Sequence, residues 1–293
     1  MAQFEGVIPY LATPTSNAGE IDTQMMSRLC EHLIAKGVHG LCPLGSTGEF
    51  AYLSGSQKAL TIETVIAAAA GRVPVIAGVA GTATQDAVAQ AKTAKAAGAD
   101  GILAVMEAYF PIDEKGVVAY FTAIADATDL PVTIYTNPNF QRSDLSLSAI
   151  ERLSHHPNIV ALKDASTNTG RLLSVINRMD GRLDVFAASA HITIAVMLIG
   201  GKGWMAGPSC LVPEKSVQLF ELCKARNWDA AMILQRELWA INETFAKYNL
   251  AGAIKAGLRL QGLDCGDPIP PQASVSAQGV EEIRSVLEKL EAL

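Results

Sequence analysis

A lysine at the end of an apolar stretch is the residue best suited to chemistry in this chain. Lys163 stands within residues 159–166, a segment that is apolar up to the lysine and follows Pro157 and Asn158. Such a segment is typical of a short buried strand. Burial disfavours the ammonium form and lowers the pKa of a lysine from its usual value of about 10.4, and the neutral amine attacks ketones. The competing interpretation is a lysine whose ammonium group reaches solvent from the strand end.

Hydroxyl groups stand at two other places where apolar segments end. Ser46 and Thr47 lie between Gly45 and Gly48, and Tyr135 closes a second apolar segment. Glycines let the backbone approach a small anion, whose carboxylate accepts hydrogen bonds from N–H groups and hydroxyls. A phenol beside an amine can serve as a general acid and base. Taken singly, the loop is also typical of an ordinary turn, and the tyrosine of a packed aromatic ring.

Composition indicates a globular protein with a sizeable core. The chain has 293 residues, of which 49% are hydrophobic and 18% charged, enough for one large α/β domain or two small ones. The net charge of −6 comes without long runs of one sign, so we expect neither a nucleic acid nor a membrane surface as a partner. The N-terminal residues lack the basic and apolar regions of a signal peptide, which predicts a cytoplasmic location.

Neither the cysteines nor the histidines form a recognisable metal site. The five cysteines are odd in number and scattered through apolar segments, which indicates reduced core residues. The five histidines lack metal-ligand spacing such as H-E-x-x-H, and no phosphate-binding or dinucleotide-binding motif is present, so we expect no metal and no cofactor. Only His191 is expected near the site, either as a proton donor or substrate contact or as a residue that starts a helix.

The elements that must position these residues alternate regularly between strand and helix. Eight strand–helix units predict a (β/α)8 TIM barrel with a C-terminal helical extension. A doubly wound open sheet is the alternative, but no G-x-G-x-x-G follows the first strand. In a barrel the catalytic residues lie at the carboxyl ends of the strands, which brings Lys163, Tyr135 and Ser46 together. The expected strands are 6–13, 39–44, 74–80, 101–109, 131–135, 159–166, 183–188 and 203–207.

Helix signals fall between these strands. Asp22 is suited to cap a first helix whose apolar residues recur at helical spacing until Gly37. We expect residues 1–212 to form the barrel core, and residues 213–293 to form the last barrel helix and a helical region packed on the barrel. The other expected helices are 54–70, 84–97, 115–127, 146–153, 169–179, 192–199, 228–248, 251–261 and 280–293.

Three motifs in order resemble one enzyme family, that of dihydrodipicolinate synthase and N-acetylneuraminate lyase, the class I aldolases and lyases that form a Schiff base. The family's G-[ST]-T-G-E stands at 45–49, its Y-N-x-P region at 135–138, and its lysine strand at 162–166. The resemblance covers essentially the whole chain. It implies that Lys163 forms the Schiff base with pyruvate or another 2-oxo acid, while Tyr135 relays protons.

The resemblance also implies roles for further residues. Ser46 and Thr47 hold the substrate carboxylate, with Ser46 in a hydroxyl chain to Tyr135. Tyr109 matches a tyrosine that family members contribute across a dimer interface, which implies a homo-oligomer, a dimer of dimers. We take Lys163, Tyr135, Ser46 and Tyr109 as the catalytic set. The expected substrate contacts are Ser46, Thr47, Gly48, Phe140, Ser189 and Met205.

Three departures from the family pattern concern the second substrate. Phe140 stands where dihydrodipicolinate synthases have an arginine that grips the carboxylate of aspartate semialdehyde, and Arg142 lies two residues further on. Residues 188–191 read Ala-Ser-Ala-His in place of an acidic or hydroxyl-binding set. Ala108 replaces the tyrosine that usually precedes Tyr109. These changes favour an apolar or aromatic partner over an acidic or polyhydroxylated one.

The sequence therefore predicts a lyase, either an aldolase or a dehydratase, that acts on pyruvate or another 2-oxo acid and an aldehyde through a lysine imine. An iminium draws electrons from the adjacent carbon, so one intermediate supports aldol addition, cleavage or loss of a hydroxyl group. Two alternatives stay open. One is a genuine dihydrodipicolinate synthase in which Arg142 replaces the missing arginine, and the other is a barrel that binds a 2-oxo acid without turnover.

Overall fold

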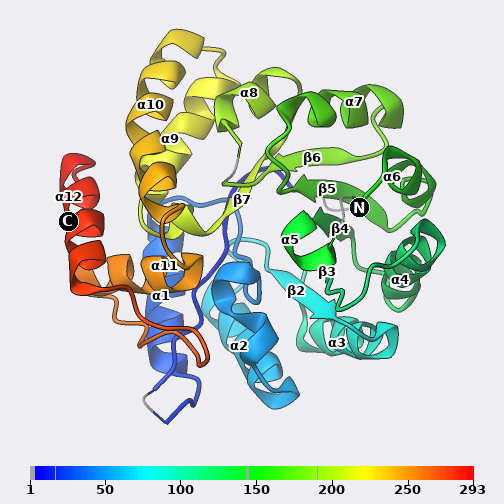
Figure 1. Ribbon diagram of the computed structural model, residues 1–293, viewed down its shortest axis with the longest axis horizontal. Helices are drawn as coiled ribbons and strands as arrows, with labels where there is room; N and C mark the ends of the chain where they lie inside the picture. The colour runs from blue at the N-terminus through cyan, green and yellow to red at the C-terminus, as the bar shows by residue number, and fades with distance from the viewer. Residues whose placement is uncertain (1–3, 17, 143–144, 190) are drawn as a thin grey trace.

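Seven parallel strands form one curled sheet at the centre of the molecule (Figure 1). The computed structural model describes residues 4–16, 18–142, 145–189 and 191–293. The strands run in the order β1-β7-β6-β5-β4-β3-β2. Every residue of β2 and β3 is buried, as expected for strands covered by helices on the outside and by side chains within. Their bounds are β1 Gly6–Pro9, β2 Ile76–Gly81, β3 Gly101–Met106, β4 Val132–Thr136, β5 Ile159–Asp164, β6 Asp184–Ala187 and β7 Gly203–Ala206.

The expected strand 39–44 is not a regular strand, yet it closes the barrel. Cys42 forms a parallel bridge with Tyr10 after β1, and Leu41 forms one with Val75 before β2. Regular pairing stops there because Pro43 has no N–H to donate and Leu44 has a positive φ of 59°. The segment thus joins both edges of the sheet, and the fold is the predicted (β/α)8 barrel.

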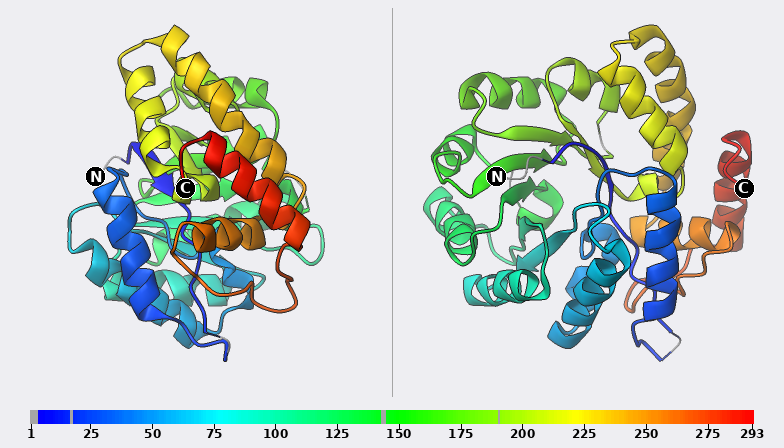
Figure 2. Two further views of the ribbon diagram at one scale, coloured as in Figure 1. Left: turned by 90° about the vertical axis from the view of Figure 1, so that its left-hand side faces the viewer. Right: turned by 180° about the vertical axis from the view of Figure 1, so that it is seen from behind.

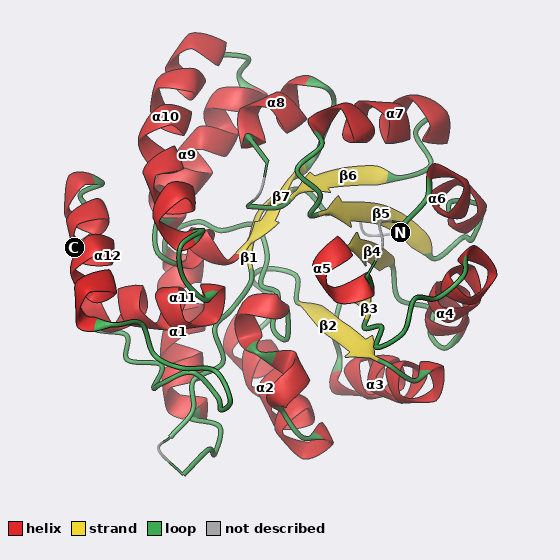
Figure 3. Cartoon of the chain, in the orientation of Figure 1, coloured by secondary structure: helices red, strands yellow, loops and turns green. Residues whose placement is uncertain are grey.

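Helices cover the outside of the barrel (Figure 3). Asp22 caps α1 by accepting a hydrogen bond from Met25 N, as predicted. Ser54 and Gln57 form a reciprocal capping box at the start of α2. Two helices, α3 and α7, have the predicted bounds. The helices of this layer are α1 Thr23–Ala35, α2 Gly55–Ala69, α3 Thr84–Ala97, α4 Glu114–Asp126, α6 Leu147–Leu153, α7 Thr169–Met179, α8 Thr193–Leu198 and α9 Pro213–Lys224.

The C-terminal helices flank one side of the barrel (Figure 2). They are α10 Trp228–Phe245, α11 Leu250–Leu260 and α12 Ala277–Lys289. The first packs against α8 and α9, and α11 lies against the 3-10 helix Ser46–Gly48 in the loop after Cys42. A C-terminal helix therefore supports the loop that carries two of the predicted site residues. The division of the chain at residue 212 stays a prediction.

A one-turn helix that the sequence did not predict, α5 Pro138–Gln141, follows β4 directly. Asn137 caps it by accepting a hydrogen bond from Asn139 N, and Pro138 occupies its first turn, where a missing N–H costs little. A hydrogen bond from Ala108 N to Phe140 O ties it to the segment after β3. In the described part of the chain, no helix is long and apolar enough to cross a membrane.

Candidate active site

Lys163 is a buried amine on β5, and the parallel register explains its neighbours. Lys163 pairs with Tyr135 on β4 and with Phe186 on β6. The lysine side chain is only 3% exposed. Burial lowers the pKa of Lys163, while the nearby Tyr135 acts in the opposite direction. The predicted buried lysine is therefore present at the carboxyl end of its strand, and the alternative of a solvated ammonium group does not apply.

The carboxylate of Asp164, the residue after Lys163, is paired with other groups. Asp164 accepts a hydrogen bond from Arg171 Nε at 2.9 Å and one from Ser166 N at 2.7 Å. Asp164 is fully buried, and the guanidinium of Arg171 balances its charge. The amine of Lys163 forms no ion pair among the described residues. A lysine without its own carboxylate loses its proton more easily on burial.

Two phenol rings enclose the amine instead. Lys163 Nζ lies 3.5 Å from the ring centroid of Tyr135 and 4.7 Å from that of Tyr10. The two rings meet edge to face at 6.2 Å. Ring faces stabilise a cation, so this arrangement suits an amine that becomes a cationic iminium. The sequence did not single out Tyr10, because it stands in the first strand without any motif around it.

The hydroxyl of Tyr135 is held by Asn137, whose Nδ2 donates a hydrogen bond to it at 2.9 Å. Gln141 braces the same strand end by donating from Nε2 to Tyr135 O, while its Oε1 accepts from Asn137 N and from Thr136 Oγ1. Among the described residues, no hydrogen bond joins Tyr135 to Ser46. The hydroxyl chain from Ser46 that the resemblance implies thus stays a prediction, and Asn137 is the observed partner.

The loop 45–48 brings free hydrogen-bond donors to the same pocket. Gly48 N and Glu49 N donate within the 3-10 turn, whereas the amides of Ser46 and Thr47 donate to no backbone group among the described residues. The buried hydroxyl of Thr47 also lacks a protein partner. Unpaired buried donors are rare in proteins, so this loop is suited to an anionic ligand.

Close packing holds this loop in place. The ring of Tyr10 lies against Gly45, where an added Cβ would stand 2.6 Å from Tyr10 Cδ2. At Gly207 an added Cβ would stand 2.3 Å from Thr47 Oγ1. Gly48 is buried, and its carbonyl accepts a hydrogen bond from Thr13. The phenol that encloses the lysine therefore also supports the loop that presents the donors.

A buried ion pair anchors the end of the loop. Glu49 Oε2 lies 2.7 Å from Lys255 Nζ on α11, and both side chains are at most 1% exposed. Glu49 Oε1 accepts hydrogen bonds from Ile269 N and from Gln272 Nε2. Glu49 adopts a left-handed conformation with φ of 55°, which turns its side chain away from the Ser46 and Thr47 hydroxyls and towards the C-terminal segment. Sequence reasoning missed this pair, because its members lie far apart along the chain.

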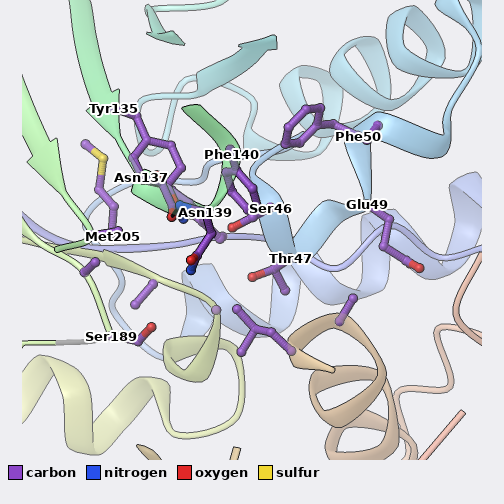
Figure 4. A pocket seen from close by; sticks show the side chains of 18 of the residues that line it. Ser46, Thr47, Glu49, Phe50, Tyr135, Asn137, Asn139, Phe140, Ser189 and Met205 are labelled. Atoms are coloured by element: carbon purple, nitrogen blue, oxygen red, sulfur yellow. Dashed lines mark hydrogen bonds between the residues drawn. The ribbon is translucent and has the colours of Figure 1, made fainter. Parts of the chain in front are cut away.

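One cavity of about 530 Å³ at the barrel mouth is lined by Lys163, by the two phenols and by Ser46 and Thr47. Figure 4 shows part of its lining. Phe140 forms part of its wall, and its ring meets that of Tyr135 edge to face at 6.4 Å. Glu107 also lines it, and burial raises the pKa of this carboxyl group while Lys58 lowers it. The predicted residues that the structure brings together here are Lys163, Tyr135, Ser46, Thr47, Phe140, Ser189 and Met205.

Four residues considered from the sequence do not line this cavity. Gly48 packs behind it and is not among its lining residues. Arg142 is exposed and is not a lining residue either. Tyr109 is 78% exposed, and its ring meets that of Phe110 at 4.9 Å. His191 lies beside the pocket and is buried, whereas Ala190 lies outside the described residues.

The arrangement suits covalent chemistry by an amine. In the described ranges, no group of three or more His, Cys, Asp or Glu side chains could hold a metal ion. A barrel with a buried lysine between two phenols, facing a loop of free donors, defines the class of lyases that form a Schiff base. Comparison with known proteins identifies which family within this class.

The model of the dihydrodipicolinate synthetase family matches residues 3–290. The 4-hydroxy-tetrahydrodipicolinate synthase of Methanosphaerula palustris is 34% identical over 97% of this chain and 98% of its own. The crystal structure of dihydrodipicolinate synthase from Aquifex aeolicus is 27% identical, with a TM-score of 0.94 over 99% of both chains. The protein YagE from E. coli, a family member solved in complex with pyruvate, is 26% identical with a TM-score of 0.93 over 100% of both chains. The chain belongs to the dihydrodipicolinate synthetase family and is a lyase, as predicted.

Proposed function

We propose that this lyase acts on pyruvate or another 2-oxo acid by forming an imine at Lys163. The observation that carries the proposal is the buried amine of Lys163, which lies 3.5 Å from the ring centroid of Tyr135 at the wall of the mouth cavity. Ser46 and Thr47 line the same cavity, and their hydroxyls, together with backbone amides that donate to no backbone group in the described part of the chain, suit the carboxylate of the acid. The pyruvate complex of the relative YagE supports this choice of substrate.

The mechanism begins when the neutral amine of Lys163 attacks C2 of the 2-oxo acid. The carbinolamine loses water, and protonation of the imine gives an iminium that draws electrons from C3. Tyr135 takes a proton from C3 and returns it, and Asn137 holds the phenol in place through its hydrogen bond. The ring faces of Tyr135 and Tyr10 stabilise the positive charge on nitrogen. The same intermediate serves aldol cleavage, aldol addition or dehydration.

The cavity wall favours an apolar or aromatic aldehyde as the second substrate. Phe140 presents a ring where an acidic partner needs a cation, and Glu107 adds a carboxyl group to the same wall. A carboxylate on the incoming aldehyde meets repulsion from Glu107 and finds no arginine on the described wall of the cavity. A screen of aldehydes with pyruvate tests this. A ranking led by aspartate semialdehyde or by polyhydroxylated acids contradicts it.

The second candidate function is 4-hydroxy-tetrahydrodipicolinate synthase itself. The observation in its favour is the name of the relatives, which are about one third identical over nearly the whole chain. The position of Arg142 argues against it, because this side chain is exposed and does not line the cavity. Mixing pyruvate with aspartate semialdehyde separates the two candidates. Turnover near the roughly 10 per second that is common among enzymes favours the synthase.

Borohydride trapping tests the proposed function directly. Pyruvate and borohydride should add a reduced three-carbon acid to one peptide, the one that contains Lys163, and mass spectrometry identifies it. Lys202, a partly exposed lysine on the segment before β7, serves as the internal control and should stay unmodified. Labelling at another lysine contradicts the site. Failure to trap any 2-oxo acid favours the barrel that binds without turnover.

We also propose that the protein works as a homo-oligomer, a dimer of dimers, in the cytoplasm. The support is the exposed pair of rings after β3, Tyr109 at 78% and Phe110 at 70% exposure, beside the partly exposed Ile112. Apolar rings of this size in one short segment suit an interface between copies of the chain. Sedimentation velocity at micromolar concentration is the measurement. An active monomer contradicts the assembly and the role of Tyr109 across an interface.

A further inference from the structure

The ring of His191 is buried, and neither of its nitrogens has a hydrogen-bond partner in the described part of the chain. The residue lies between β6 and α8, and only 2% of its surface is exposed. A neutral imidazole carries one donor and one acceptor, and leaving both unpaired in the interior is destabilising. Such a residue requires an explanation other than packing.

A small chamber of about 50 Å³ adjoins His191, with several polar side chains in a mostly apolar lining. Its walls include the buried Ser216 and Gln235 as well as Ser189. Gln235 Oε1 accepts hydrogen bonds from Thr193 Oγ1 and Ile194 N, so its position is fixed, whereas its amide nitrogen donates to no group among the described residues. A chamber of this size accommodates one or a few water molecules, and each water needs about 2–4 polar partners. It is too small for an aromatic ring.

The chamber lies next to the cavity that contains Lys163. The two spaces share three lining residues, Ala188, Ser189 and Ala206. His191 is close enough to the reacting groups for Asp164 to raise its pKa and Lys163 to lower it, although burial is the larger influence and lowers the pKa overall. The imidazole is therefore neutral and able to accept a proton.

We propose that the His191 chamber is a water site that serves imine formation and imine hydrolysis at Lys163. This inference rests on the proposed function and adds a binding site to it. His191, Ser216 and Gln235 hold the water, and Ser189 lies where the chamber meets the cavity. His191 acts on the water and not on the carbon skeleton of the substrate.

The chemistry balances without another reactant. When the neutral amine condenses with the ketone, the C2–O bond breaks, the C2=N bond forms, and one water leaves whose two hydrogens come from the lysine nitrogen. Hydrolysis is the reverse: a water oxygen attacks C2 of the iminium, and neutral His191 accepts one proton from it. That proton passes to the nitrogen, the C2–N bond breaks as C2=O forms, and the remaining hydroxyl proton goes to the departing amine, which leaves as ammonium with His191 neutral again. The chamber meets the cavity at Ser189, whereas Tyr135, which acts at C3, does not line the chamber.

The test compares two steps in the same turnover. In heavy water, each C3 proton transfer adds deuterium to pyruvate, while hydrolysis decides when the labelled pyruvate is released. His191→Leu fills the chamber with an apolar side chain, so release should slow by about tenfold or more. The released pyruvate should then shift towards the triply labelled form, because each imine passes through more proton transfers before hydrolysis. Mass spectrometry at early times measures both quantities.

Matched variants complete the experiment. His191→Gln retains hydrogen bonding, so it should restore part of the release rate, and it carries the test if the leucine variant does not fold. His156→Leu removes a histidine whose ring already contacts Asp126 and Asn158, and it should leave the labelling pattern unchanged. An unchanged rate and pattern in His191→Leu overturn the water site. A change confined to the KM of the aldehyde overturns it as well, in favour of a substrate contact. If the wild-type protein itself neither traps nor labels pyruvate, the proposed function is what fails.

Discussion

Two lysines in this molecule are almost completely buried, and their surroundings differ. Lys163 is 3% exposed and faces the rings of Tyr135 and Tyr10. Lys255 is 1% exposed, and its Nζ lies 2.7 Å from the carboxylate of Glu49 and 2.9 Å from Asp267 O. One lysine has π faces as neighbours, and the other has a full counter-charge.

The comparison shows that burial alone does not make a lysine reactive. An ammonium group paired with a carboxylate stays charged, and a charged amine does not attack a ketone. Around Lys163 the nearest carboxylate, that of Asp164, is neutralised by Arg171. In the proposed function, Lys163 serves chemistry and Lys255 serves structure, and the difference lies in the partner that each one meets.

The largest expected effect comes from replacing Lys163, and it tests the proposed catalytic role of this lysine. Lys163→Arg replaces the amine by a guanidinium that cannot form an imine, so both borohydride trapping and turnover should disappear while the fold persists. Mass spectrometry and circular dichroism measure the two results. Trapping that survives in this variant would falsify the assignment of Lys163.

The next largest effect comes from removing the hydroxyl of Tyr135 while keeping its ring. Tyr135→Phe retains a ring face beside the amine and removes the proton relay, so turnover should fall by the roughly 10²–10⁴-fold typical of lost acid–base catalysis. Slow trapping by borohydride should continue, because imine formation does not need C3 proton transfer. Steady-state kinetics show the fall, and loss of less than tenfold assigns the proton transfer to another group.

Breaking the ion pair between Glu49 and Lys255 should lower the stability of the fold. Glu49→Gln leaves the ammonium of Lys255 buried without its counter-charge, which should cost about 3–5 kcal/mol in the free energy of unfolding. The double variant Glu49→Leu with Lys255→Met removes both charges and should lose less than the single one. Urea unfolding of the three proteins is the measurement. Equal losses in the single and double variants contradict a role for the charge pair.

The smallest expected effect is on the free energy of unfolding, which the burial of Lys163 lowers. Burial lowers the folded-state pKa of Lys163, so between that pKa and the roughly 10.4 of the unfolded chain, unfolding takes up a proton and stability rises with pH. Lys163→Met removes this dependence and should stabilise the fold at neutral pH. The advantage should shrink towards pH 10. Thermal unfolding across this pH range that shows a constant difference contradicts the lowered pKa.

Much of this fold follows from local signals. The bounds of α3 and α7 match the prediction, because Gly98 ends the first in a left-handed conformation and Asn168 caps the second. The segment 39–44 reads as a strand from its apolar residues, yet Pro43 interrupts its pairing and leaves only bridges. A single turn such as α5 is too short for any periodicity to predict it.

The residues of the candidate site also fall into those that the sequence predicted and those that it missed. Lys163, Tyr135 and the loop 45–48 were predicted because each ends a strand, and a barrel brings strand ends together. Tyr10 was missed, since an aromatic residue in a buried strand has no local mark of function. The pairing of Glu49 with Lys255 was missed too, because no property of either residue indicates which distant partner it meets.

The hydrogen bonds of Glu49 can form only late in the synthesis of the chain. The carboxylate of this residue accepts from Ile269 and Gln272, more than 200 positions later in the chain. All the strands of the barrel end by Ala206, so a growing chain can close the barrel well before those partners exist. Contacts over such a separation form late, since the loop between them must first close. The loop that carries Ser46 and Thr47 therefore gains the last of its supports only once residue 272 has been made, and a chain that stops short of it is a barrel with an incompletely held candidate site.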